Sequence, residues 1–117
     1  MSRDLYTFFR SSTSYRLRIA LAHKRLEYTP HYVSLPKMEH RTPSYQALHA
    51  QGLVPLLIDG DQSLIQSMAI IEYLDEVYPD PPLLPAETNG RHYVRAVSQI
   101  IGCDIHPLNN VRVLKHL

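Results

Sequence analysis

Hydrophobic and polar positions change their spacing several times along the chain, and the changes predict alternating strands and helices. Residues 5–9 read Leu-Tyr-Thr-Phe-Phe, which predicts a first strand. From residue 14 to about residue 26, apolar positions recur every three or four residues, as in a helix. Residues 28–35 again read as a strand. Pro30 cannot donate to a strand ladder, so this strand is predicted at the sheet edge.

The middle of the chain continues the alternation. It predicts a loop over 36–43, a short helix over 44–50 and strands over 53–58 and 63–65. Asp59-Gly60, between the two apolar runs, favours a hairpin. Gln66-Ser67 then begins a helix with one apolar face, which the proline-rich residues 79–82 end.

The last part of the chain no longer alternates between strands and helices. Residues 83–89 are punctuated by proline and predict a linker. A new helix is predicted from Gly90, with a kink or a change of register at Pro107. Its apolar positions need partners that the sequence does not supply, because a lone helix is marginally stable in water. The chain is therefore expected to be cut short or to rely on another chain.

The predicted order is βαβαββα followed by a helix, which indicates an α/β fold. It is typical of a thioredoxin-like domain, here over 1–82, joined by the linker 83–89 to the start of an all-α domain over 90–117. The 117 residues suffice for one small domain and a fragment of a second.

Composition and charge exclude several classes of protein. The formal net charge is +1, with no basic face that would suit nucleic acid. No apolar run is long enough to cross a bilayer, and the first residues lack a secretory core. Cys103 is the one cysteine, so no internal disulfide can form, which favours the reducing cytoplasm. We expect Cys103 to be a small buried apolar residue.

A metal site is not predicted. The chain has seven histidines, but none form an H-x-H or H-x-x-x-H pair, and Cys103 has no cysteine partner.

The most informative stretch lies between the first strand and the first helix. Ser11, Ser12, Thr13 and Ser14 place four hydroxyls at a predicted helix N-terminus, where backbone N–H groups are unpaired and the helix dipole is positive. One N-cap accounts for one of the four. The others, flanked by Arg10 and Arg16, indicate a site for an anion such as a thiolate, carboxylate or phosphate.

Five motifs in order resemble the zeta-class glutathione transferases, and within that class the maleylacetoacetate and maleylpyruvate isomerases. They are residues 10–21, Leu53-Val54-Pro55, residues 66–74, Leu83-Leu84-Pro85 and residues 102–110. Family members continue through a complete helical domain, and they are homodimers.

Two positions depart from the family pattern. Thr13 and Tyr15 stand where the zeta motif usually has Cys and Trp, and threonine is more similar to the bacterial maleylpyruvate branch. His49-Ala50 replaces the usual Asn-Pro before the third strand, which is expected to alter a turn rather than the chemistry.

The resemblance implies a glutathione-dependent cis–trans isomerase that converts a maleyl to a fumaryl compound by reversible thiolate addition. Glutathione would be the cofactor, and a small dicarboxylate the substrate of a cytoplasmic homodimer. Two alternatives stay open. One is a broader glutathione transferase or a dehalogenase of small α-haloacids. The other is a truncated, non-catalytic glutathione-binding module.

The resemblance also implies roles for residues in the first domain. Ser11 would stabilise the glutathione sulfur, with Ser12 and Thr13 lining the same turn. Val54, before a cis proline, would pair through its backbone with the cysteinyl residue; from the sequence alone, Pro55 could equally begin a strand. Gln66 and Ser67 would hold the γ-glutamyl carboxylate, a role that an N-cap serine can share.

The other predicted contacts with glutathione or the substrate come from residues spread along the chain. His40 would contact glutathione, although a loop histidine is more often simply solvated. Arg10 would bind a substrate carboxylate. His106, Asn110 and Arg112 would lie over the glutathione, with Arg112 reaching the substrate or remaining a surface charge. Arg16 and Arg18 are expected to be structural.

Overall fold

The computed structural model describes residues 2–107, and the chain divides into two compact units at residues 81 and 82. The first unit contains a four-stranded sheet built from β1 (Arg3–Thr7), β2 (Thr29–Tyr32), β3 (Leu56–Asp59) and β4 (Gln62–Ile65). The strand order is β2-β1-β3-β4, with β1 and β2 parallel and the other pairs antiparallel. This order confirms the edge position predicted from Pro30 and the β3–β4 hairpin.

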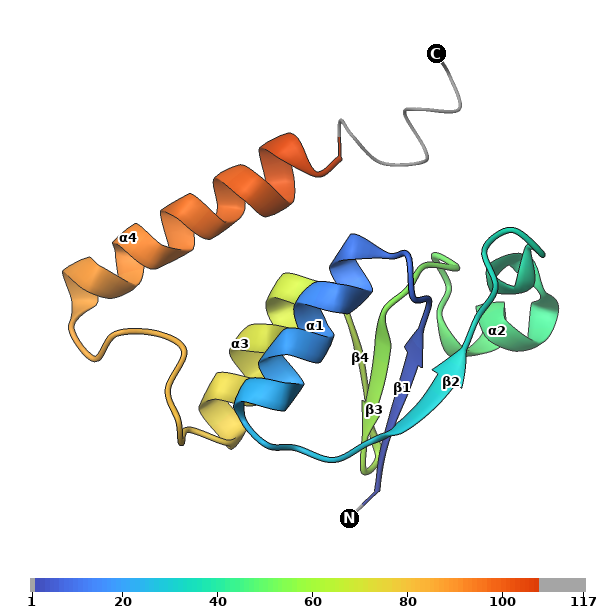
Figure 1. The fold of residues 1–117 in the computed structure, drawn as a ribbon, viewed down its shortest axis with the longest axis horizontal. Coiled ribbons are helices and arrows are strands. Elements are labelled where there is room, and N and C mark those ends of the chain that lie inside the picture. Colours follow the sequence, from blue (N-terminus) through green and yellow to red (C-terminus); the bar gives the residue numbers. More distant parts are fainter. Residues whose placement is uncertain (1, 108–117) are drawn as a thin grey trace. The chain divides into compact units, whose positions relative to one another are not determined.

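Helices cover the sheet because its strands bury apolar side chains. Figure 1 shows α1 (Ser12–His23) and α3 (Ser67–Val77) side by side against the sheet. Between them and the strands lie fully buried side chains, each worth about 1.5–3 kcal/mol of transfer free energy: Leu5, Leu17, Leu21, Leu57, Ile70 and Leu74. A second cluster joins Tyr45 of α2 (Pro43–Leu48) to Val33 and Leu56.

Several predicted boundaries are wrong by a few residues. The strand of residues 5–9 is in fact β1, which ends at Thr7, because the Ser11 N–H donates to the Phe8 carbonyl and turns the chain. The first helix begins two residues earlier than predicted, at Ser12. The predicted loop 36–43 contains a 3₁₀ helix, η1 (Glu39–Arg41).

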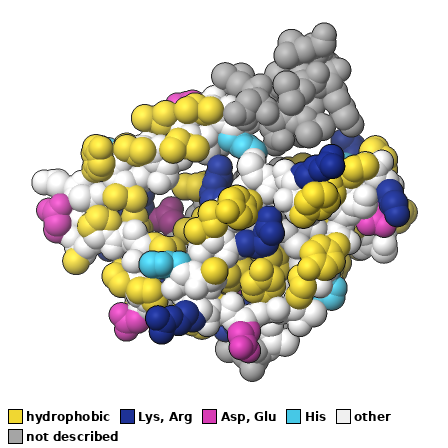
Figure 2. All heavy atoms as spheres, viewed as in Figure 1, with side chains coloured by type: hydrophobic (Ala, Val, Ile, Leu, Met, Phe, Trp, Pro, Cys, Tyr) yellow, Lys and Arg dark blue, Asp and Glu magenta, His cyan; other side chains and the backbone are white. Residues whose placement is uncertain are grey.

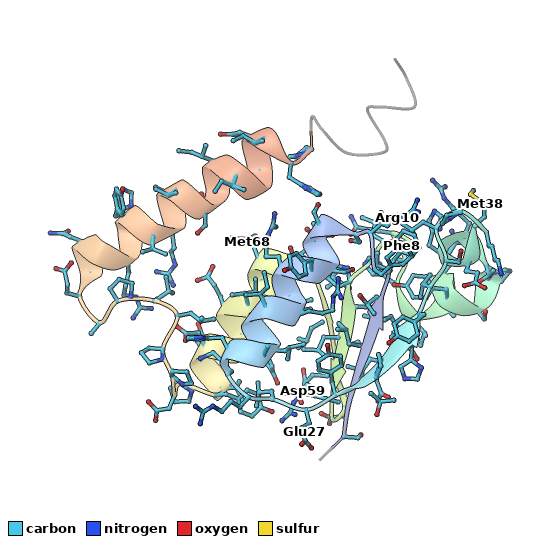
Figure 3. The ribbon with its side chains drawn as sticks, in the orientation of Figure 1. Phe8, Arg10, Glu27, Met38, Asp59 and Met68 are labelled. Atoms are coloured by element: carbon cyan, nitrogen blue, oxygen red, sulfur yellow. The ribbon has the colours of Figure 1, made fainter. Side chains whose placement is uncertain are left out.

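A polar network closes the sheet at the end of β3. Asp59 is buried there and accepts hydrogen bonds from the hydroxyls of Tyr73 and Tyr78, at 3.0 and 2.8 Å. The Arg3 Nε lies 3.2 Å from the other carboxylate oxygen. Figure 3 shows Asp59 at one end of the sheet and Phe8 and Arg10 at the other.

The second unit contains α4 (Thr88–Gln99), which continues into a π-helix, η2 (Ile100–Ile105). The helix begins at Thr88 rather than Gly90, because the Glu87 carboxylate accepts the Gly90 N–H as an N-cap. The register of the helix changes along η2, since the His106 N–H bonds to the carbonyl of Ile101, five residues back.

Several large apolar side chains of the described part of this unit are exposed. Figure 2 shows them at the surface along α4, and the exposed large ones are Tyr93, Val97, Ile100, Ile101 and Ile105. Cys103 is exposed as well, so the prediction of a buried cysteine is wrong. Within residues 2–107, no helix is long and apolar enough to cross a membrane.

Candidate active site

The hydroxyl cluster forms the beginning of α1. Ser11 has extended backbone angles, and its Oγ accepts the Ser14 N–H at 3.1 Å, which makes it the N-cap. The helix therefore presents its first unpaired N–H groups just after the turn that follows β1. Ser14 itself is completely buried, so the structure removes this fourth hydroxyl from the candidate anion site.

Two of the remaining hydroxyls form a chain of hydrogen bonds that runs from Ser11 through Thr13 to the Val54 carbonyl. The Thr13 Oγ1 donates to the Val54 carbonyl at 3.2 Å and lies 3.0 Å from the Ser11 Oγ. A hydroxyl has one hydrogen, so Thr13 must accept from Ser11 while it donates to Val54. An anionic sulfur at this turn would compete with Thr13 for the Ser11 hydrogen, whereas the Ser11 oxygen would continue to cap the helix.

The segment before β3 meets α1 at this point. The Val54-Pro55 peptide bond is cis, as the resemblance implied. Thr13 already donates to the Val54 carbonyl. A carbonyl oxygen has two lone pairs, so one acceptor position remains for a backbone partner. Tyr45, buried in α2, donates its hydroxyl hydrogen to the Leu53 carbonyl and holds this segment against the second cluster.

A tight turn brings the loop of His40 close to this segment. Gly52 has a φ of +63°, and a Cβ atom there would lie 2.8 Å from the His40 carbonyl oxygen. A side chain at this position would therefore be strained by its backbone and would displace His40. The structure thus places the half-buried His40 next to the segment that carries Val54.

His49 shapes the same turn. Its Nδ1 accepts the Gln51 N–H at 3.2 Å and its carbonyl accepts the Gly52 N–H at 2.9 Å. An acceptor Nδ1 requires the neutral ring with its proton on Nε2. Asparagine side chains commonly bond the N–H two residues ahead, so histidine here performs the turn function of the residue that it replaces. Burial lowers the pKa of His49.

The beginning of α3 provides the second anion-binding element. Gln66, the residue before the helix, has a φ of +70°, which is unusual for a residue with a side chain. Its Nε2 lies 3.1 Å from the Gln51 Oε1, so the His49 turn also supports Gln66. Ser67 is 6% exposed and accepts a hydrogen bond from Arg16 at 3.0 Å. The sequence analysis placed Arg16 beside the hydroxyl cluster and expected it to be structural, but it did not predict this contact with Ser67.

The other predicted residues are placed as follows. Arg10 is exposed, with its guanidinium 5.3 Å from the Phe9 ring centroid (Figure 3). Arg18 has the predicted structural role, since it stacks over Tyr15 and donates to the Phe9 carbonyl. Ser12 is exposed in the first turn of α1.

The predicted contacts of the second unit are only partly described. His106 is half-buried at the end of the π-helix. Asn110 and Arg112 lie outside the described residues. Among residues 2–107, no group of three or more His, Cys, Asp or Glu side chains could hold a metal ion.

The mixed four-stranded sheet with helices against it is the thioredoxin-like fold of glutathione transferase N-terminal domains. The family pattern described as "Glutathione S-transferase, N-terminal domain" matches residues 5–82, and the chain belongs to this family.

Individual relatives are similar to this chain over nearly its whole length. A maleylpyruvate isomerase of a Ralstonia species is 56% identical over 97% of this chain and 53% of its own length. The holo structure of a maleyl pyruvate isomerase, a bacterial zeta-class glutathione S-transferase, superposes with a TM-score of 0.94 at 55% identity, over 97% of this chain and 54% of that one.

A maleylacetoacetate isomerase from Methylobacterium extorquens, with bound malonate and glutathione, has a TM-score of 0.93 at 39% identity, over 97% of this chain and 54% of its own. The chain thus spans about half the length of the curated relatives that it matches. These comparisons confirm the predicted fold and the resemblance to zeta-class enzymes.

Replacement of His49 by asparagine tests the turn. The folded chain has a lowered His49 pKa, and the unfolded chain has an ordinary one of about 6.5. Below about pH 6.5 the unfolded chain therefore binds more protons, and the free energy of unfolding falls as the pH is lowered. Urea unfolding at about pH 7.5 and about pH 5.5 should show a smaller fall for His49→Asn. An equal fall in both proteins would contradict this assignment.

Two substitutions at Gln66 test the backbone strain at this position. Glycine tolerates a positive φ, so Gln66→Gly should unfold with a free energy about 1 kcal/mol higher than Gln66→Ala. Chemical denaturation of the two variants measures this difference. Equal stability of the two variants would show that residue 66 is not strained.

Proposed function

We propose that this chain is the glutathione-binding half of a cis–trans isomerase that converts a maleyl to a fumaryl dicarboxylate. Both maleylacetoacetate and maleylpyruvate fit this description. The observation that carries the proposal is the meeting of three elements within one unit: the capped start of α1, the Val54-Pro55 segment and the start of α3.

The donor set fits glutathione group by group. The γ-glutamyl carboxylate suits Ser67 and the first N–H groups of α3. The cysteinyl backbone suits Val54, in the manner of an added strand. The sulfur suits Ser11, with Ser12 and Thr13 in the same turn and the positive end of α1 behind them. Gln66 and His40 complete this set of proposed contacts.

Cis–trans isomerisation requires that the carbon–carbon double bond become a single bond for a time and then form again. When bound, glutathione supplies a thiolate that adds to one alkene carbon and leaves again after rotation about the resulting single bond, so it is recovered unchanged. The protein must keep that sulfur ionised. The Ser11 hydroxyl hydrogen and the α1 N-terminus both stabilise a negative sulfur and lower the pKa of its thiol.

The substrate carries two carboxylates. Arg10 is exposed next to the hydroxyl turn, and its planar guanidinium matches a carboxylate with two parallel hydrogen bonds. By family resemblance, His106, Asn110 and Arg112 would approach glutathione from the helical domain, and Arg112 would hold the second carboxylate.

We further propose that the whole protein is a homodimer in the cytoplasm, which analytical ultracentrifugation and cell fractionation test.

The isomerase assay tests the proposal directly. The full-length enzyme, glutathione and a maleyl substrate should lower the substrate's keto-enol absorbance faster than glutathione alone. Ser11→Ala should reduce the rate on the order of 10²-fold, as the loss of one oxyanion donor does. Ser11→Asp keeps a capping oxygen but replaces the donor by a negative charge, so it should lose at least as much. Ser63→Ala, an exposed hydroxyl in β4, serves as the control.

The products separate this proposal from its competitors. An isomerase returns all the glutathione, whereas a transferase or a dehalogenase consumes it. Chain that binds glutathione without any rate above the background would contradict the isomerase proposal and leave a binding module.

A further inference from the structure

Arg16 connects two helices at the proposed glutathione site. It comes from α1, is half-buried, and its Nη1 lies 3.0 Å from the Oγ of Ser67, the first residue of α3. An arginine carries donors only, so the Ser67 oxygen must accept in this hydrogen bond. The Ser67 hydroxyl hydrogen is therefore directed to another acceptor.

Arg16 places a positive charge beside the start of α3. This start is the positive end of a helix dipole, and cations stabilise helices at the opposite end. The first turn of α3 contains no acidic residue. The guanidinium and the helix dipole therefore act in the same direction, and both favour an anion at this position.

Arg18 shows what a purely structural arginine of the same helix looks like. Its guanidinium lies 5.2 Å from the Tyr15 ring centroid, and it donates to the Phe9 carbonyl at 3.4 Å. Neither contact involves α3, and neither uses a side-chain hydroxyl as the hydrogen-bond acceptor. The two arginines are two residues apart and equal in charge, so they make a matched pair.

We infer that Arg16 is a positioning residue for the γ-glutamyl carboxylate of glutathione. It orients the Ser67 hydroxyl so that its hydrogen points to the carboxylate, and it adds a full positive charge to the partial charge of α3. This inference rests on the proposed glutathione site and extends it to a residue outside the set listed above. Figure 3 shows Met68, the neighbour of Ser67, at the same end of the sheet as Arg10.

Two ligands test the inference in the full chain by isothermal titration calorimetry. One is glutathione, and the other is 4-aminobutanoyl-cysteinyl-glycine, which lacks only the γ-glutamyl carboxylate. Arg16→Met should weaken glutathione binding roughly 10-fold to 100-fold, as expected for a charge-assisted hydrogen bond. It should change binding of the analogue less than about threefold. Arg16→Lys should recover part of the affinity, and Arg18→Met should leave both ligands unaffected.

A second comparison remains decisive if the analogue binds too weakly to measure. In a Ser67→Ala background, Arg16→Met should cost less than about threefold, because the orienting contact is already absent. Circular dichroism and thermal unfolding establish that each variant is folded, and an unfolded Arg16→Met is replaced in both comparisons by Arg16→Lys.

The possible results distinguish a failure of this inference from a failure of the proposed function. Equal losses for both ligands, or the same loss with and without the Ser67 hydroxyl, would make Arg16 structural and overturn the inference. Unchanged glutathione binding in Arg16→Met would overturn it as well, while the proposed function would stand. An unaltered chain that binds no glutathione would remove the proposed function and the inference together.

Discussion

The hydrogen bond from the Ser14 N–H to the Ser11 Oγ decides where α1 begins, and the geometry of the site follows from that point. A cap of this kind contributes about 1 kcal/mol, a modest part of the stability. The cap matters more for where the side chains of α1 lie. Successive residues turn by about 100° around a helix axis, so a start shifted by one residue would rotate Thr13 away from Val54 and Arg16 away from Ser67. The N-cap thus holds three segments of the sequence in one arrangement.

The site is consequently organised around one helix. Thr13 reaches the segment before β3, and Arg16 reaches the start of α3, 51 residues away in the chain. The His49 turn supports Gln66 through Gln51. A change in any of these supports would move the proposed binding groups without removing one of them. The buried His49 and the half-buried Arg16 can therefore influence the proposed site without contacting a ligand.

Local signals in the sequence predicted the order of the elements, the hairpin at Gly60 and the edge strand with Pro30, because each depends on neighbouring residues. The family motifs predicted the cis bond before Pro55. The interaction of Arg16 with Ser67 could not be predicted, since it depends on how two distant helices pack. Ser14 resembled its neighbouring hydroxyls in the sequence, yet the rotation of the helix buries it. Which atom of His49 accepts a hydrogen bond is likewise a matter of side-chain orientation.

The central claim is that the start of α1 keeps a bound thiol ionised. An ultraviolet titration of glutathione bound to the full chain measures this directly, because a thiolate absorbs where a thiol does not. We predict that the pKa of the bound thiol lies at least about one unit below the usual cysteine value of about 8.5. A bound thiol that ionises at that usual value or above it would contradict the account.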